Sequence, residues 1–321
     1  MRLELIFPIH LREGLKSVVK MPDLEEIRVR IGQPVFIYVG EKEFILGQND
    51  KDKNSRVLCD SMNRKLYESA YRITEQDLLE MQNYISNYSL YAWQEELRNG
   101  FLTVEGGHRI GLCGSTKNIN GRIAGISYLS GLNVRVAHEK KGCSEQVMKY
   151  IRYGEADIYN TLIVSAPGIG KTTLLRDCVR LLSYGEGQYR GKRVGVVDER
   201  SEIAACYHGI PQNDMGPRTD VLDGCNKPEG MMMLLRTMSP EVIGVDELGT
   251  KEDFEAVEQV AYCGCRLIGT VHAGNKKELQ EKSRFYGWGK RGIFERFIII
   301  EKGEEGKRNL HIYDNQWVEL F

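Results

Sequence analysis

The second half of the chain alternates short apolar runs with segments of helical periodicity. The runs are continuous and rich in β-branched residues, which is typical of strands buried on both faces. They lie at residues 162–164, 194–197, 242–245 and 267–271, and helical spacing separates them at 173–182, 229–238 and 253–263. This alternation predicts an α/β domain in which helices cover a parallel sheet. The last runs, 297–301 and 310–313, flank a charged, glycine-containing turn and predict a hairpin at the edge of the sheet.

The first part of the chain follows another pattern, of short strands around one helix. The strand-like runs lie at 26–31, 34–39, 43–46, 101–104, 109–113, 117–119, 122–126 and 134–137. A helix is predicted over 75–91 with Thr74 as its cap, and Asn120-Gly121 predicts a tight hairpin turn. The polar residues 139–142 are the expected linker. These signals predict a small α+β domain.

Length and composition fit this division and exclude several classes of protein. A chain of 321 residues favours two domains, which we place at 1–142 and 143–321. The balance of 44 basic and 45 acidic residues lacks the positive footprint of a dedicated nucleic-acid binder, so no nucleic-acid partner is expected. The eight cysteines include no Cys-x-x-Cys pair and are expected to be reduced thiols. Neither a secretory signal nor a 20-residue apolar span is recognisable, so we expect a cytoplasmic protein that meets membranes only through a partner.

The strongest chemical signal is a phosphate-binding loop between a predicted strand and a predicted helix. The loop comprises Ser165, Ala166, Pro167, Gly168, Ile169, Gly170, Lys171, Thr172 and Thr173. Backbone N–H groups of such a loop surround phosphates, the lysine reaches the outer phosphates, and the hydroxyl of Thr172 binds Mg²⁺. Ser165 stands where the usual pattern has its first glycine, while Gly170, Lys171 and Thr172 match it. The predicted ligands are ATP and Mg²⁺.

Two predicted strands end in paired carboxylates. Asp246 and Glu247 follow the run 242–245, and Asp198 and Glu199 follow 194–197. We favour Asp246 as the carboxylate on the Mg²⁺ side and Glu247 as the general base that polarises water. The alternative for the earlier pair is a solvated strand end, or a pair that fixes the following loop.

Several other polar residues are candidates for the same site. His272, at the end of the run 267–271, can sense the terminal phosphate or serve only as a cap or core partner. Arg218 lies in a polar Pro/Gly-rich stretch at 210–220, which favours a phosphate or neighbour-subunit contact. Arg109 and Arg135 are candidate arginine fingers that act across a ring interface. The basic and aromatic stretch 276–296 could stack bases, although a partner-binding or solvated surface is favoured.

With these motifs in hand, the chain resembles the stage III sporulation protein AA family, whose ATPases are related to type II and type IV secretion ATPases. The segments that carry the resemblance are 24–30, 88–92, 105–111, the phosphate-binding loop, 197–203, 216–223 and 238–247. The resemblance implies a RecA-like ATPase domain of the ASCE type behind the smaller N-terminal domain, working as a homohexamer. It also implies a membrane-protein partner in the sporulation apparatus, reached from the mother cell side.

The resemblance assigns further roles by position. Residues 197–203 correspond to the aspartate box of secretion ATPases, 242–247 to their Walker B strand and 269–272 to their histidine box. In that correspondence, Glu199 or Glu202 competes with Glu247 as the residue that activates water. The expected function is an ATP-hydrolysing motor for a sporulation channel. The alternatives are a nucleic-acid-dependent ATPase and a scaffold that binds ATP with little turnover.

Overall fold

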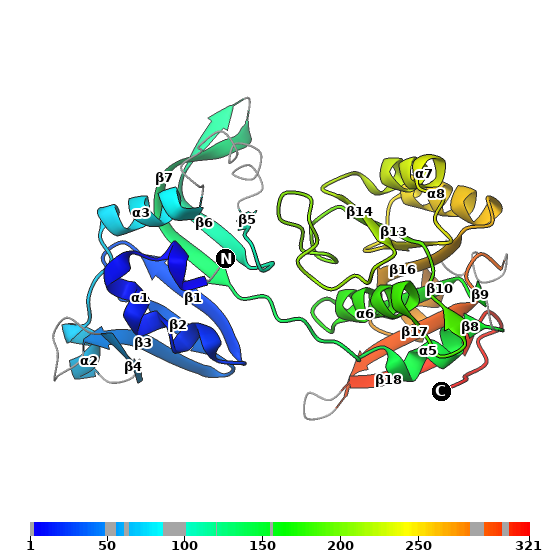
Figure 1. The fold of residues 1–321 in the computed structure, drawn as a ribbon, viewed down its shortest axis with the longest axis horizontal. Helices are drawn as coiled ribbons and strands as arrows, with labels where there is room; N and C mark the ends of the chain where they lie inside the picture. The colour runs from blue at the N-terminus through cyan, green and yellow to red at the C-terminus, as the bar shows by residue number, and fades with distance from the viewer. Residues whose placement is uncertain are drawn as a thin grey trace. The chain divides into compact units, whose positions relative to one another are not determined.

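The computed structural model describes residues 3–48, 56–60, 64–85, 101–119, 121–154, 157–282, 292–303 and 308–321 (Figure 1). The chain forms two compact units, Met1–His138 and Glu139–Phe321. The division falls at the start of the polar segment 139–142, whereas the sequence placed it after Gly142.

The first unit contains a seven-stranded antiparallel sheet in the order β4-β3-β2-β1-β7-β6-β5. The strands are β1 Leu24–Arg30, β2 Phe36–Val39, β3 Lys42–Gln48, β4 Arg56–Asp60, β5 Phe101–Thr103, β6 Arg109–Ile119 and β7 Arg122–Arg135. The helical segments are η1 Leu3–Ile6, α1 Ile9–Leu15, η2 Val18–Lys20, α2 Arg64–Ser69 and α3 Glu75–Ile85. Alternate residues of β1, including Ile27 and Val29, are buried in one core with side chains of η1, α1 and α3.

Two expectations for this unit change in detail. The run 122–126 and the first two residues of the run 134–137 belong to one long strand, β7, which pairs with β6 on one side and with β1 on the other, and the runs 109–113 and 117–119 likewise belong to one strand, β6. The helix expected over 75–91 is described as Glu75–Ile85, and the rest of the range lies outside the described residues, as does Asn120 of the predicted turn. The motif at 88–92 is likewise outside them.

The second unit contains a seven-stranded sheet in the order β14-β13-β15-β16-β10-β17-β18. The strands are β10 Thr161–Ser165, β13 Val194–Asp198, β14 Thr219–Asp223, β15 Val242–Val245, β16 Arg266–His272, β17 Arg296–Lys302 and β18 Arg308–Asp314. Neighbouring strands are parallel except β17 and β18, which are antiparallel. The predicted α/β class and the edge hairpin are therefore confirmed. Strand β14 was not predicted.

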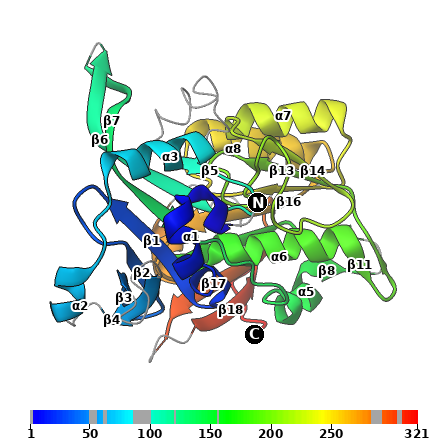
Figure 2. The ribbon, with the colours of Figure 1, turned by 60° about the vertical axis from the view of Figure 1, so that its left-hand side comes forward.

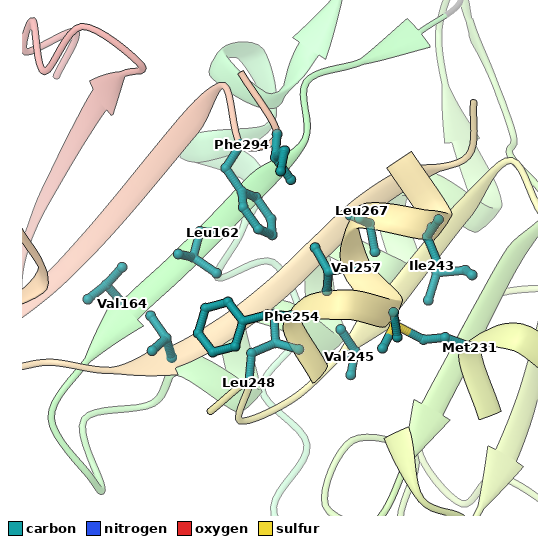
Figure 3. Close-up of a cluster of buried hydrophobic side chains, with 14 of the residues drawn as sticks. Leu162, Val164, Met231, Ile243, Val245, Leu248, Phe254, Val257, Leu267 and Phe294 are labelled. Carbon is teal, nitrogen blue, oxygen red and sulfur yellow. The ribbon is translucent and has the colours of Figure 1, made fainter. Parts of the chain in front are cut away.

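Helices cover both faces of this sheet (Figures 1 and 2). They are α5 Glu145–Ile151, α6 Lys171–Tyr184, α7 Lys227–Thr237, α8 Lys251–Tyr262 and α9 Lys276–Glu281. Two short antiparallel ladders lie outside the sheet. They pair β8 Arg152–Tyr153 with β9 Asp157–Ile158, and β11 Gly185–Glu186 with β12 Tyr189–Arg190. Leu162 and Val164 of β10 pack with Phe254 and Val257 of α8 (Figure 3), whereas Ile163 between them packs with α5 and α6 on the other face. Because β10 is buried on both faces, the loop at its carboxyl end has a fixed origin.

Candidate active site

The phosphate-binding loop joins β10 to α6. Ser165 is buried as the last residue of β10, where it pairs with His272 of β16 and Ile300 of β17. The left-handed conformations of the loop fall on Gly168, with φ 76°, and on Gly170, with φ 111°. Serine is therefore tolerated at position 165, because that residue keeps strand geometry while the later glycines make the turn.

The start of α6 fits a phosphate group. Gly170 is the N-cap of this 14-residue helix and provides no side-chain cap, and the first turn contains no acidic residue. The free N–H groups and the helix dipole therefore favour an anion at this point. The buried side chain of Lys171, the first residue of α6, adds a positive charge.

A hydroxyl and a carboxylate that suit Mg²⁺ meet beside this helix. Oγ1 of Thr172 donates a hydrogen bond of 2.7 Å to Oδ2 of Asp246, which directly follows β15, and Thr270 of β16 donates to the other carboxylate oxygen. Within the described ranges, no group of three or more His, Cys, Asp or Glu residues could hold a metal. Mg²⁺ would therefore be held by Thr172 and Asp246 together with phosphate oxygens, as is usual for this ion.

Glu247 turns back toward the loop through an uncommon backbone conformation. Its φ is 54°, in the left-handed region that non-glycine residues rarely occupy. Its N–H donates to Oγ1 of Thr270 at 2.8 Å and to Oδ1 of Asp246 at 3.1 Å, and these bonds stabilise the turn. The strained backbone conformation therefore occurs at a residue whose side chain faces Lys171 of the loop.

The carboxylate of Glu247 is surrounded by donors. Nζ of Lys171 lies 3.3 Å from Oε1, Nε2 of His272 lies 2.9 Å from the same oxygen, and Nη1 of Arg200 donates to Oε2 at 2.8 Å. Burial raises the pKa of Glu247, but the hydrogen bond from His272 and the charges of Lys171 and Arg200 outweigh burial and hold the pKa below its usual value. Glu247 is therefore ionised at neutral pH and can accept a proton.

The second acidic strand end has mainly structural contacts. Both oxygens of Asp198 are used by the N–H groups of residues 202–204, at 2.8 to 2.9 Å, which fixes the following loop. Burial raises the pKa of Asp198 to about 6, against these hydrogen bonds. Glu199 pairs with Lys227 at the start of α7, and the carbonyl of Glu202 accepts from Arg176 of α6 at 2.6 Å. The observed contacts of Asp198 are those of the loop-fixing alternative.

All three candidate glutamates nevertheless line one small pocket. Glu199 and Glu202 face it together with Asp246 and Glu247. Of these glutamates, Glu247 lies 3.3 Å from Lys171 of the loop, so the geometry ranks it first as the candidate that activates water. The competition with the aspartate-box glutamates remains a prediction to be tested.

The arginines predicted for the site lie elsewhere. Nη1 of Arg218 donates to the carbonyl of Ser183 at 2.8 Å, in the last turn of α6. That position is about 20 Å from the phosphate-binding loop, given a rise of about 1.5 Å per residue. In the first unit, Arg109 and Arg135 face each other across β6 and β7, with Arg109 over the ring of Phe101. The structure of one chain therefore does not bring Arg218 to the loop, and the finger roles of Arg109 and Arg135 stay predictions.

Arg200 is a site residue that the sequence argument missed. It directly follows Asp198 and Glu199, so its place in the motif 197–203 was the available signal. The basic and aromatic side chains at 284–291 lie outside the described residues.

A larger hollow of about 620 Å³ lies at the opposite edge of the sheet, among residues that precede the strands. Three of its cations form ion pairs, since Lys192 and Arg193 contact Glu241 and Arg266 contacts Asp157, and Nε of Arg236 donates to the carbonyl of Met232 within α7. The chemistry is concentrated at the edge with the loop.

The strand order and the loop define a RecA-like P-loop ATPase fold, in which one strand separates the loop strand from the carboxylate strand. Solved structures agree. The chain is similar to the Legionella pneumophila ATPase DotB, with a TM-score of 0.58 and 17% identity over 96% of this chain and 81% of that one. It is also similar to the pilus retraction motor PilT with bound ADP, with a TM-score of 0.58 and 13% identity over 95% of this chain and 81% of that one.

The chain belongs to the stage III sporulation protein AA family. The family model described as "Sporulation stage III, protein AA" matches residues 51–320. Stage III sporulation protein AA of Bacillus subtilis (strain 168) is 34% identical over 312 residues, which cover 96% of this chain and 93% of that protein. The resemblance inferred from the sequence motifs is thus confirmed. In the described part of the chain, no helix has the length and apolar character needed to cross a membrane.

Proposed function

We propose that this protein hydrolyses ATP at the loop between β10 and α6. The observation that carries the proposal is the meeting of two elements at one helix terminus: Thr172 with Asp246 at 2.7 Å, and Lys171 with Glu247 at 3.3 Å. A lysine, a hydroxyl and two carboxylates in this arrangement are the groups that phosphoryl transfer to water requires.

Each residue has a defined task in this proposal. Bound ATP and Mg²⁺ supply the phosphoryl group and neutralise charge on its oxygens. Backbone N–H groups of the loop hold the phosphates, and Lys171 exchanges its contact with Glu247 for a contact with them. Glu247 orients water and takes its proton, while His272 holds the carboxylate by the hydrogen bond at 2.9 Å.

The work done by hydrolysis is the second part of the proposal. Membership of the sporulation family, together with a fold shared with a pilus retraction motor, supports a motor that energises a trans-envelope channel between mother cell and forespore. The protein would act as a cytoplasmic homohexamer on the mother cell side, joined to the membrane through a membrane-protein partner. Arg109, Arg135 and Arg218 are the candidates for contacts with a neighbouring subunit.

Phosphate release by the purified protein, with ATP and Mg²⁺, tests the enzymatic part. Hydrolysis should be lost in Lys171→Ala and kept in Lys251→Ala, which removes an exposed lysine that pairs along α8 with Glu255. Wild-type protein that binds ATP without releasing phosphate would favour the scaffold alternative.

Three further measurements test the motor. Sporulation should fail in a strain that carries Lys171→Ala, and the protein should assemble into a larger species when ATP and Mg²⁺ are added. Strong stimulation of ATPase activity by single-stranded DNA would contradict the channel motor and favour a nucleic-acid-dependent ATPase.

A further inference from the structure

A second cation touches the phosphate-binding loop from the edge of the sheet. Arg308 is the first residue of β18 and is distant in sequence from the loop. A β-carbon added to Gly170 would lie 2.8 Å from Nη1 of Arg308 and 3.0 Å from its Cζ and Nη2. The guanidinium group therefore lies directly against the backbone of the residue that caps α6.

The surroundings of Arg308 leave its charge without an anion. Its side chain is exposed, and among the described residues it has neither an ion pair nor a hydrogen bond. The first turn of α6 offers no acidic residue, and Lys171 is already paired with Glu247. A cation beside the positive end of a helix dipole is unfavourable unless an anion joins it. The positive charge of Arg308 and the positive end of α6 together therefore favour binding of an anionic ligand.

The position of Arg308 relative to the loop indicates which phosphates of the ligand it would contact. In the sheet, β16 and β15 lie on one side of β10 and bring His272 and Glu247, whereas β17 and β18 lie on the other side. In the proposed reaction the terminal phosphate faces Glu247. Arg308 therefore approaches the loop from the side opposite to the bond that breaks.

We infer that Arg308 binds the phosphates that ATP and ADP have in common, and that it contributes to nucleotide affinity and not to the hydrolytic step. The inference rests on the proposed function, since it assigns a further ligand residue to the same site. Arginine suits the task because its planar group can donate two hydrogen bonds to one phosphate.

Titration calorimetry with ADP, and with a non-hydrolysable ATP analogue, tests the inference in the presence of Mg²⁺. Arg308→Ala should weaken both affinities by a similar factor, on the order of tenfold or more, because charge-assisted hydrogen bonds are lost. The affinities of Arg308→Lys should fall between those of this variant and of wild type. Lys302→Ala is the matched control, since Lys302 is exposed and lies directly across the ladder from Arg308.

The outcomes separate this inference from the proposed function. Unchanged ADP affinity in Arg308→Ala, in a wild-type background that binds ADP, would overturn the inference alone. A loss confined to the ATP analogue or to kcat would assign Arg308 to the terminal phosphate and would also overturn it. An equal loss of nucleotide affinity in Lys302→Ala would show that the effect comes from general surface charge, and would overturn the inference. Wild-type protein that binds neither nucleotide would remove the proposed function as well. Thermal melting of each variant checks its fold, and Arg308→Gln replaces the alanine variant if that one unfolds.

Discussion

Replacing Glu247 by glutamine separates the binding and hydrolysis of ATP. The substitution removes the negative charge and keeps the size of the side chain. It also keeps one acceptor oxygen for the hydrogen bond from His272, which is 2.9 Å long in the wild-type protein. An amide cannot take a proton from water. We expect the hydrolysis rate to fall by about 10² to 10⁴, the usual contribution of general-base catalysis.

Nucleotide affinity should move in the opposite direction. Nζ of Lys171 is 3.3 Å from Oε1 of Glu247, and both side chains are largely buried. At this distance, the Coulomb energy is about 5 kcal/mol with an effective dielectric constant of about 20. Desolvation of both ions cancels most of that energy. Suppose that the net attraction between Lys171 and Glu247 is about 1.4 kcal/mol, which ATP must offset when it binds Lys171. Removing the charge of Glu247 then tightens ATP binding about tenfold.

The assay combines direct ATP binding with phosphate release. Glu247→Gln should bind ATP at least as tightly as wild type while hydrolysing it slowly. Glu199→Gln and Glu202→Gln are the matched controls, since both residues line the same pocket. Wild-type turnover in Glu247→Gln, with turnover lost in either control, would refute the assignment and make an aspartate-box glutamate the base.

Three further changes test other contacts. Arg200→Ala removes a partner at 2.8 Å from Glu247, so the pKa of Glu247 should rise and the acid limb of the kcat profile should move to higher pH; an unmoved limb would contradict this. Asp177→Asn weakens bonds from the N–H groups of Gly142 and Ser144. These bonds lower the pKa of Asp177 against the opposing effect of burial. The contribution is present above pH 3.8 and is lost as pH falls through the folded-state pKa. Denaturation should therefore show a loss of about 2–4 kcal/mol at pH 7 that shrinks in acid, whereas a constant difference would argue against the contact. Arg218→Ala should cost on the order of 1 kcal/mol of stability and leave ADP affinity unchanged; weaker ADP binding by the monomer would place Arg218 at the site.

The sequence predicted the second unit well where strands are buried on both faces. A continuous apolar run bounded by polar residues is typical of such a strand, and β10, β13, β15 and β16 each coincide with one. Strand β14 was not predicted, because it is only partly buried and contains Asp220 and Asp223, so its sequence lacks a continuous apolar run. Strand β7 was split in two because Ser127, Ser130 and Gly131 interrupt its apolar pattern.

The site was predictable as far as local motifs reach. The loop and the pair Asp246 and Glu247 carry their chemistry in adjacent residues, so their pattern is visible in sequence. The contacts of Arg200 and Arg308 depend on which strands lie side by side, and no local spacing encodes that. The left-handed φ of Glu247 is equally invisible, because it depends on the hydrogen bond that the N–H of Glu247 donates to Oγ1 of Thr270 on β16.

The two sides of the loop therefore differ in charge before any nucleotide binds. On the side of β15, Lys171 and Arg200 both form ion pairs with Glu247, so a phosphate can gain Lys171 only by taking it from a carboxylate. On the side of β18, Arg308 and the start of α6 are positive and have no such competitor among the described residues. Phosphates that engage the second side first would meet no competing anion, and the exchange at Lys171 would follow. In the proposed reaction, that order would release Glu247 from Lys171 only after phosphates have entered the loop, so the freedom of the proposed base would depend on bound nucleotide.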